Sequence, residues 1–152
     1  MGKEMVVVKH GEAEELNVMG AAVRFLCGAD KTERSWSLME VEVPERAGPP
    51  PHDHPWDEAY YVVAGEVRFQ LDGREQVYKA GDFIFAPGGT VHGFQGASSK
   101  PARLLIFDAP AHAESFFRET AREVKEMPRD LPKALAIGQR HQINFRVPQP
   151  TS

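Results

Sequence analysis

Features of secreted and membrane-bound proteins are largely missing from this sequence. It has a single cysteine, Cys27, so no disulfide can form within the chain. No apolar run approaches the roughly 20 residues that a membrane-spanning helix needs. Residues 1–8 lack the longer apolar core of a signal peptide, and Val6 stands where a myristoylation signal requires Ser or Thr. We therefore expect a cytoplasmic protein that has no membrane partner.

An excess of positive charge is also absent. The 18 Lys and Arg residues are outnumbered by 22 Asp and Glu residues, which gives a net charge of −4. A chain of this charge is not suited to bind nucleic acid, so we expect no such partner. The 152 residues are enough for one domain with a substantial apolar core.

Short strands separated by glycine-containing turns are predicted through most of the chain. In residues 36–43, Met39, Val41 and Val43 alternate with glutamates, which is typical of a half-buried antiparallel strand. A strand at 21–27 would place Cys27 in the core. Many short strands of this kind indicate a sandwich or barrel. The other predicted strands are 5–10, 58–63, 66–71, 75–79, 82–86, 91–95 and 102–108.

Helical periodicity replaces this pattern after residue 110. Apolar side chains recur at helical spacing between 111 and 127, and a shorter helix is predicted at 133–137. An extended segment, 142–147, follows. We expect residues 1–110 to form a β-barrel and residues 111–152 to pack on it as a helical extension of the same domain. The extension either packs beside the barrel or covers its mouth as a lid.

Three histidines and a glutamate form the strongest candidate site. His52 and His54 would project from one face of an extended segment, with Cα atoms roughly 6.5–7 Å apart. A turn at 55–57 brings Glu58 back beside them, and His92 follows a second turn. Three imidazoles and one carboxylate suit a divalent transition metal. By itself, a His-x-His pair is also consistent with hydrogen-bonded histidines that bind no metal.

The spacing of these residues resembles the two motifs of the cupins. The first motif matches at His52, His54, Glu58 and Gly65, and the second at Gly81, Pro87, Gly89 and His92. Two positions depart from the motifs, because Arg46 replaces the first glycine and Gly96 replaces a final asparagine. The sequence is most similar in organisation to single-domain bacterial cupins of the quercetin dioxygenase type.

This resemblance implies an all-β jelly-roll β-barrel, or double-stranded β-helix, followed by a C-terminal helical extension. It implies one divalent metal ion (Fe, Mn, Ni, Co, Cu or Zn) held by His52, His54, Glu58 and His92. It further implies a homodimer, for which the predicted strand in residues 5–8 is a candidate contact, since an unpaired strand is a liability on a monomer.

Strand alternation predicts an apolar lining around this metal site. Tyr60 would share the face of Glu58, and Phe94 that of His92. This lining favours a small aromatic or weakly polar substrate. The resemblance to the cupins implies an oxidoreductase of dioxygenase type that acts on it, with Glu58 as a catalytic base, and Tyr60 is a second candidate catalytic residue. Two alternatives remain open: a metal-containing module that binds a small ligand without turnover, and a Lewis-acid isomerase or lyase. His10, His112 and His141 are expected to be surface or capping residues.

Overall fold

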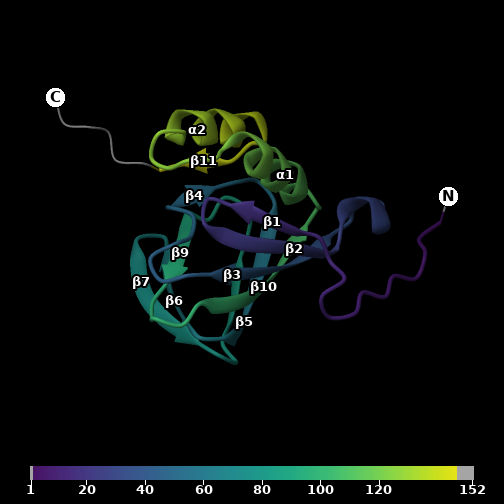
Figure 1. Cartoon of the computed structure of the whole chain (residues 1–152), viewed down its shortest axis with the longest axis horizontal. Coiled ribbons are helices and arrows are strands. Elements are labelled where there is room, and N and C mark those ends of the chain that lie inside the picture. Colours follow the sequence, from purple (N-terminus) through teal and green to yellow (C-terminus); the bar gives the residue numbers. More distant parts are fainter. Residues whose placement is uncertain (1, 147–152) are drawn as a thin grey trace.

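Two antiparallel β-sheets pack face to face, and two helices lie across one end of them (Figure 1). The computed structural model describes residues 2–146. Val147, the end of the predicted extended segment, and the remainder of the predicted extension to residue 152 lie outside the described residues. In spatial order, the six-stranded sheet comprises β1 (Glu15–Val18), β2 (Ala21–Cys27), β3 (Ser37–Val43), β10 (Ala102–Ala109), β5 (Asp57–Ala64) and β8 (Phe83–Ala86).

The second sheet has five strands and carries two of the predicted metal ligands. Its spatial order is β11 (Asn144–Phe145), β4 (His52–Asp53), β9 (His92–Gly96), β6 (Glu66–Leu71) and β7 (Arg74–Lys79). The prediction of an all-β jelly roll with C-terminal helices is confirmed. The closed barrel is wrong, because no ladder of hydrogen bonds joins the edge strands of one sheet to those of the other in residues 2–146.

The core lies between the two sheets, as the alternation of apolar residues predicts. Met39, Val41 and Val43 of β3 are buried while the glutamates between them face outward. On β5 the inward positions are Glu58, Tyr60 and Val62, so a carboxylate lies on the same buried face as apolar side chains. The packing of the two sheets therefore places the site residues inside the protein.

One predicted strand is wrong. Residues 5–10 form no strand, and Met5 is 91% exposed. The free edge of β2 is instead occupied by β1, which was not predicted and is joined to β2 by a turn in which Met19 and Gly20 have φ of 50° and 90°. Strand propensity in residues 5–8 is thus not realised, because these residues pair with none of the described strands.

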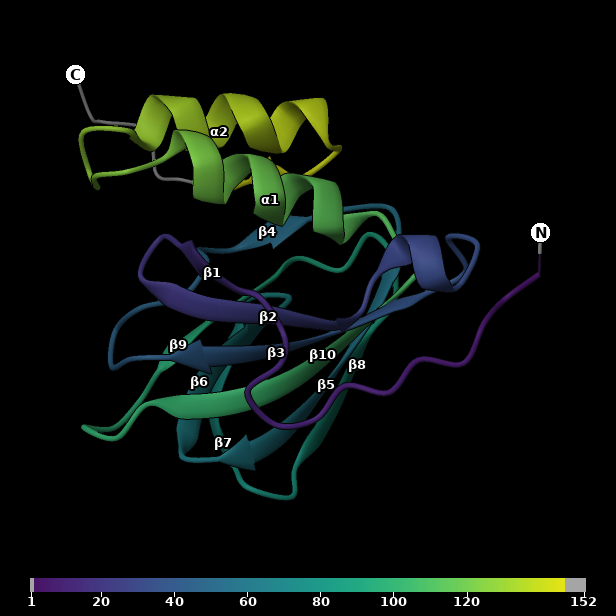
Figure 2. The same ribbon diagram turned by 45° about the vertical axis from the view of Figure 1, so that its right-hand side comes forward.

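Helix α1 (Ala113–Glu123) is shorter than the predicted helix at 111–127, and α2 (Leu131–Arg140) is longer than predicted. Helix α1 begins at Ala113 because the buried Asp108 carboxylate accepts hydrogen bonds from the backbone N–H groups of His112 and Ala113, both at 3.1 Å. Both helices lie above β1 and β4, at the end of the sheets nearest the histidines (Figure 2). None of the helices among residues 2–146 has the length and apolar character needed to cross a bilayer.

The two departures from the cupin motifs have structural explanations. Arg46 has a φ of 66°, so at this position a residue with a side chain adopts the left-handed conformation that glycine favours. A Cβ atom at Gly96 would lie 2.3 Å from the backbone oxygen of Pro44. Residue 96 must therefore be glycine here, and an asparagine would not fit without movement of the backbone.

Candidate metal centre

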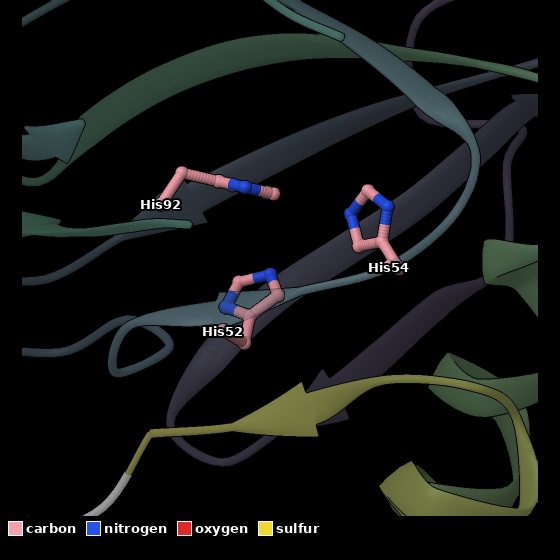
Figure 3. Close-up of side chains that lie close together, drawn as sticks. All are labelled: His52, His54 and His92. Atoms are coloured by element: carbon pink, nitrogen blue, oxygen red, sulfur yellow. The ribbon is translucent and has the colours of Figure 1, made fainter. Parts of the chain in front are cut away.

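Two neighbouring strands and the loop after one of them bring three histidine rings together. His52 on β4 lies directly opposite His92 on β9 in the strand register, and His54 follows two residues after His52. One nitrogen from each ring lies within 4.8 Å of one from each of the others. The three rings point into a shared space between the sheets (Figure 3). All three side chains are buried.

Hydrogen bonds to the backbone determine which nitrogen of each ring is available. Each Nδ1 atom lies within hydrogen-bond distance of a carbonyl oxygen two residues away along the chain. The pairs are His52 with Pro50 (2.8 Å), His54 with Trp56 (3.0 Å) and His92 with Thr90 (2.8 Å). A carbonyl oxygen can only accept, so Nδ1 carries the proton in each neutral ring and Nε2 keeps its lone pair. This is the tautomer that binds a metal through Nε2.

Two of these Nε2 atoms have no hydrogen-bond partner although they are buried. They belong to His54 and His92. The Glu58 oxygens lie 3.2 Å and 3.5 Å from them, but with Nδ1 protonated neither neutral ring has a proton to donate. Leaving buried polar atoms without a partner is costly, and a divalent ion bound at the Nε2 atoms would supply one. The side chains present therefore fit a metal ion.

Glu58 is buried between several polar groups. Its Oε1 atom accepts a hydrogen bond from Trp56 Nε1 at 3.3 Å, and its Oε2 atom accepts one from the Tyr60 hydroxyl. Burial opposes ionisation of Glu58, but hydrogen bonds and charge from His54 and His92 in their protonated forms outweigh it and hold the pKa of Glu58 well below its usual value. Burial and the Glu58 charge raise the pKa of Tyr60 well above its usual value. Glu58 is thus an ionised acceptor, and Tyr60 is a neutral donor.

The histidines differ in their affinity for protons. Burial, and secondly the neighbouring His92, lower the pKa of His52 to about 4. Burial also opposes a charge on His92, but the Glu58 carboxylate outweighs burial and raises the pKa of His92 above its ordinary value. His52 is therefore ready to act as a neutral ligand at all but acidic pH, whereas His92 holds its proton more tightly than an ordinary histidine.

A small apolar cavity of about 60 Å³ adjoins these residues. Tyr60 and Phe94 line it, in agreement with the strand alternation in the sequence. On another side its wall is formed by Phe116 of α1 and by Ile143 and Phe145 of the segment that follows α2. The helical extension thus contributes part of the wall of this cavity, and its role as a lid stays a prediction.

The structure brings all the residues of the predicted site into one region. His52, His54 and His92 form one group, and Glu58 and Tyr60 adjoin it. The assignment of Glu58 as a fourth ligand and of Glu58 and Tyr60 as catalytic residues stays a prediction. His112 and His141 lie outside the group, at the start of α1 and the end of α2.

Sequence reasoning missed two residues of the site. Trp56 stacks on the His54 ring, with centroids 4.1 Å apart and planes inclined by 6°. Phe145 lies beside the His52 ring, with centroids 5.5 Å apart. The position of Trp56 between two candidate ligands was a usable signal. No sequence signal pointed to Phe145, because it is far from His52 along the chain and no local pattern predicts that the two residues pair.

Comparison with known proteins identifies the family. Residues 39–108 match the family described as the cupin domain. The chain belongs to the cupin superfamily. Quercetin 2,3-dioxygenase of Bacillus subtilis (strain 168) is 26% identical over 113 residues, which are 74% of this chain and 33% of that enzyme. This cupin therefore aligns with only a third of the length of that relative.

Solved structures with the same fold include proteins of different activities. The polyketide cyclase RemF from Streptomyces resistomycificus has a TM-score of 0.62 and 26% identity, with 70% of this chain and 80% of that chain covered. An RmlC-like cupin from Shewanella frigidimarina NCIMB 400 has a TM-score of 0.65 and 23% identity, with coverage of 76% and 99%. Membership of the superfamily thus establishes the fold and does not select one reaction.

Proposed function

We propose that this cupin is a metal-dependent oxidoreductase of dioxygenase type. The observation that carries the proposal is the convergence of three buried imidazoles whose Nδ1 protons are bound by backbone carbonyls, which leaves their Nε2 lone pairs free. His52, His54, His92 and Glu58 would hold one divalent Fe, Mn, Ni, Co, Cu or Zn ion. Such an ion would supply an open position at which a substrate and dioxygen can meet, or at which a bound oxygen atom is polarised.

Glu58 and Tyr60 are the candidates for proton transfer within this site. Because Glu58 is ionised and buried, its carboxylate can accept a proton from a substrate hydroxyl that enters the cavity. The Tyr60 hydroxyl donates to Glu58 and orients that carboxylate. A pKa well below the usual value makes Glu58 a weak base, so the role would require a substrate hydroxyl that is itself made more acidic, as coordination to a bound ion would do.

The lining of the cavity favours a small aromatic or weakly polar substrate. It consists mainly of aliphatic and aromatic side chains, and its polar members are His52, His54, Glu58 and Tyr60. A phosphorylated sugar would need lysine or arginine in the wall, and neither type lines this cavity among the described residues. The similarity to a quercetin 2,3-dioxygenase supports an aromatic substrate.

Elemental analysis of protein purified without added metal would test the first step of the proposal. Oxygen uptake would then be measured with catechols, flavonols and diketones for protein loaded separately with each of the six metals. We expect uptake with at least one redox-active metal and its loss in His52→Ala and His92→Ala. Absence of uptake by every metal-loaded form would refute a dioxygenase.

A second candidate is a non-oxidative reaction of the isomerase or lyase class. The similarity to a polyketide cyclase at 26% identity favours it, since that relative shares the fold over 80% of its length. Turnover under strictly anaerobic conditions would select this alternative. A tightly held zinc ion would also favour it, or a binding module without turnover, because zinc has no redox chemistry.

A further inference from the structure

The cavity beside the histidines is too small for the substrate class proposed above. Its volume is about 60 Å³, whereas a cavity of about 150 Å³ is of the size that accommodates benzene. Part of its wall must therefore move before an aromatic ligand can bind. The inference below rests on the proposed function only in taking this cavity as the ligand site.

The two parts of the wall contributed by the helical extension are attached with different strength. Helix α1 is capped by the fully buried Asp108 and places Phe116, which is 4% exposed, in the core. Strand β11 has two residues and forms the edge of its sheet, and among residues 2–146 its strand partner is β4 alone. The β11 side of the wall is therefore the part that can detach at lower cost.

Besides the backbone pairing with β4 and a hydrogen bond from the Arg146 N–H to the Pro51 carbonyl oxygen at 2.7 Å, one acidic side chain ties β11 to β4. The Asp53 carboxylate accepts a hydrogen bond from Asn144 Nδ2 at 2.9 Å and two from Arg146, at 3.0 Å from Nε and 2.5 Å from a terminal nitrogen. Asn144 and Arg146 are exposed, so water competes for these bonds. We call Asp53, Asn144 and Arg146 the Asp53 latch. It lies one residue from the candidate ligand His52.

Phe145 lies between the two residues of the latch that belong to the C-terminal segment. Its ring adjoins His52 on one side, with 5.5 Å between centroids, and Phe116 at 6.0 Å. On the α2 side, a Cβ atom at Gly138 would lie only 2.8 Å from Phe145 Cε2. The lack of a side chain at Gly138 therefore makes the room in which the Phe145 ring packs.

We propose that Phe145 is the movable wall of the metal pocket and that the Asp53 latch holds it closed. Displacement of β11 from β4 removes the Phe145 ring from beside His52 and enlarges the cavity. The Phe145 ring is then the specificity-determining residue for ligand size, and the latch sets the fraction of molecules that can accept a ligand. Weakening the latch raises that fraction and the apparent affinity with it.

Indole is a suitable probe, because it is aromatic, weakly polar and larger than the closed cavity. Its binding to the metal-free protein would be measured by calorimetry for wild type, Asp53→Ala, Phe145→Ala and Glu75→Ala. Glu75 is a matched control, since its ion pair with Arg68 joins β6 and β7 and is also exposed. We expect about tenfold tighter binding for Asp53→Ala and Phe145→Ala, and no change for Glu75→Ala. Wild-type affinity in both test variants would overturn the proposal.

A reversible cross-link separates gating from misfolding. Asp53 and Asn144 are directly opposite in the β4–β11 register, which suits a disulfide between Asp53→Cys and Asn144→Cys in a Cys27→Ala background. The oxidised protein should exclude indole, and the same sample should bind it after reduction. Equal binding in both states would refute a movable wall. These measurements involve neither metal nor turnover, so they remain decisive even if the protein is not a dioxygenase.

Discussion

The lowered pKa of His52 leads to a specific prediction about stability. In the metal-free protein the pKa of His52 is about 4, whereas an unfolded histidine titrates near its ordinary value of 6.5. Between these two pH values the unfolded chain binds a proton at His52 and the folded protein does not. The free energy of unfolding therefore falls as pH decreases from about 6.5 to about 4, and His52 has no further effect below that range.

The expected size follows from the separation of the two pKa values. Each pH unit below 6.5 removes about 1.4 kcal/mol, so His52 accounts for a loss of roughly 2 kcal/mol between pH 7 and pH 5. The full loss at pH 4 is about 3 kcal/mol. A change of this size is a substantial fraction of the stability of a typical domain.

Urea unfolding in the presence of a chelator, followed by circular dichroism from pH 7.5 to 4.5, would measure this loss. His52→Gln cannot titrate, so its stability should fall less steeply, and the difference between the two curves contains the titration of His52 and its coupling to His92. The exposed His10 provides the control, because His10→Gln should parallel wild type. If the wild-type and His52→Gln curves stay parallel within about 0.5 kcal/mol, the burial argument for His52 is wrong.

Four further predictions follow from the same structure. Because the Glu58 carboxylate raises the pKa of His92, metal affinity should fall as pH decreases through that raised pKa, and Glu58→Gln should move the fall to lower pH. Competitive zinc titrations would detect this, and occupancy unchanged down to pH 4 would contradict ligation by imidazole. Trp56→Phe keeps an aromatic ring on His54 but loses the hydrogen bond to Glu58. The variant should therefore bind metal about tenfold more weakly while its circular dichroism spectrum stays unchanged. Unchanged metal affinity would show that Trp56 does not position the ligands. Phe69→Ala should lower the free energy of unfolding in urea by about 3–5 kcal/mol, because Phe69 is fully buried. Phe83, which is 64% exposed, is the control, and Phe83→Ala should lower it by less than about 0.5 kcal/mol. Similar losses in the two variants would contradict the packing. We propose that the expected homodimer uses the outer face of β5 and β8 in place of residues 5–8, because Phe83, Phe85 and Tyr61 are exposed there. Phe83→Lys should then yield monomers in sedimentation experiments. A monomeric wild type would refute the contact.

Local patterns in the sequence predict much of this fold because the relevant interactions are short in range. Alternation in β3 depends only on which residues face the core, and the Asp72-Gly73 turn between β6 and β7 forms from adjacent residues. The strand expected at residues 5–10 fails for the opposite reason. A strand needs a partner, and residues 5–10 pair with none of the described strands.

Local spacing specified the kinds of donor atom in the candidate site, because His52 and His54 alternate onto one face and both motifs keep their spacing. The folded backbone specified which nitrogens are free, because it places a carbonyl oxygen against each Nδ1 atom. It alone also decided that Phe145, 93 residues after His52 along the chain, pairs with it and closes the cavity. Contacts of that kind depend on how β11 meets β4 in space, and no local pattern of residues encodes that meeting.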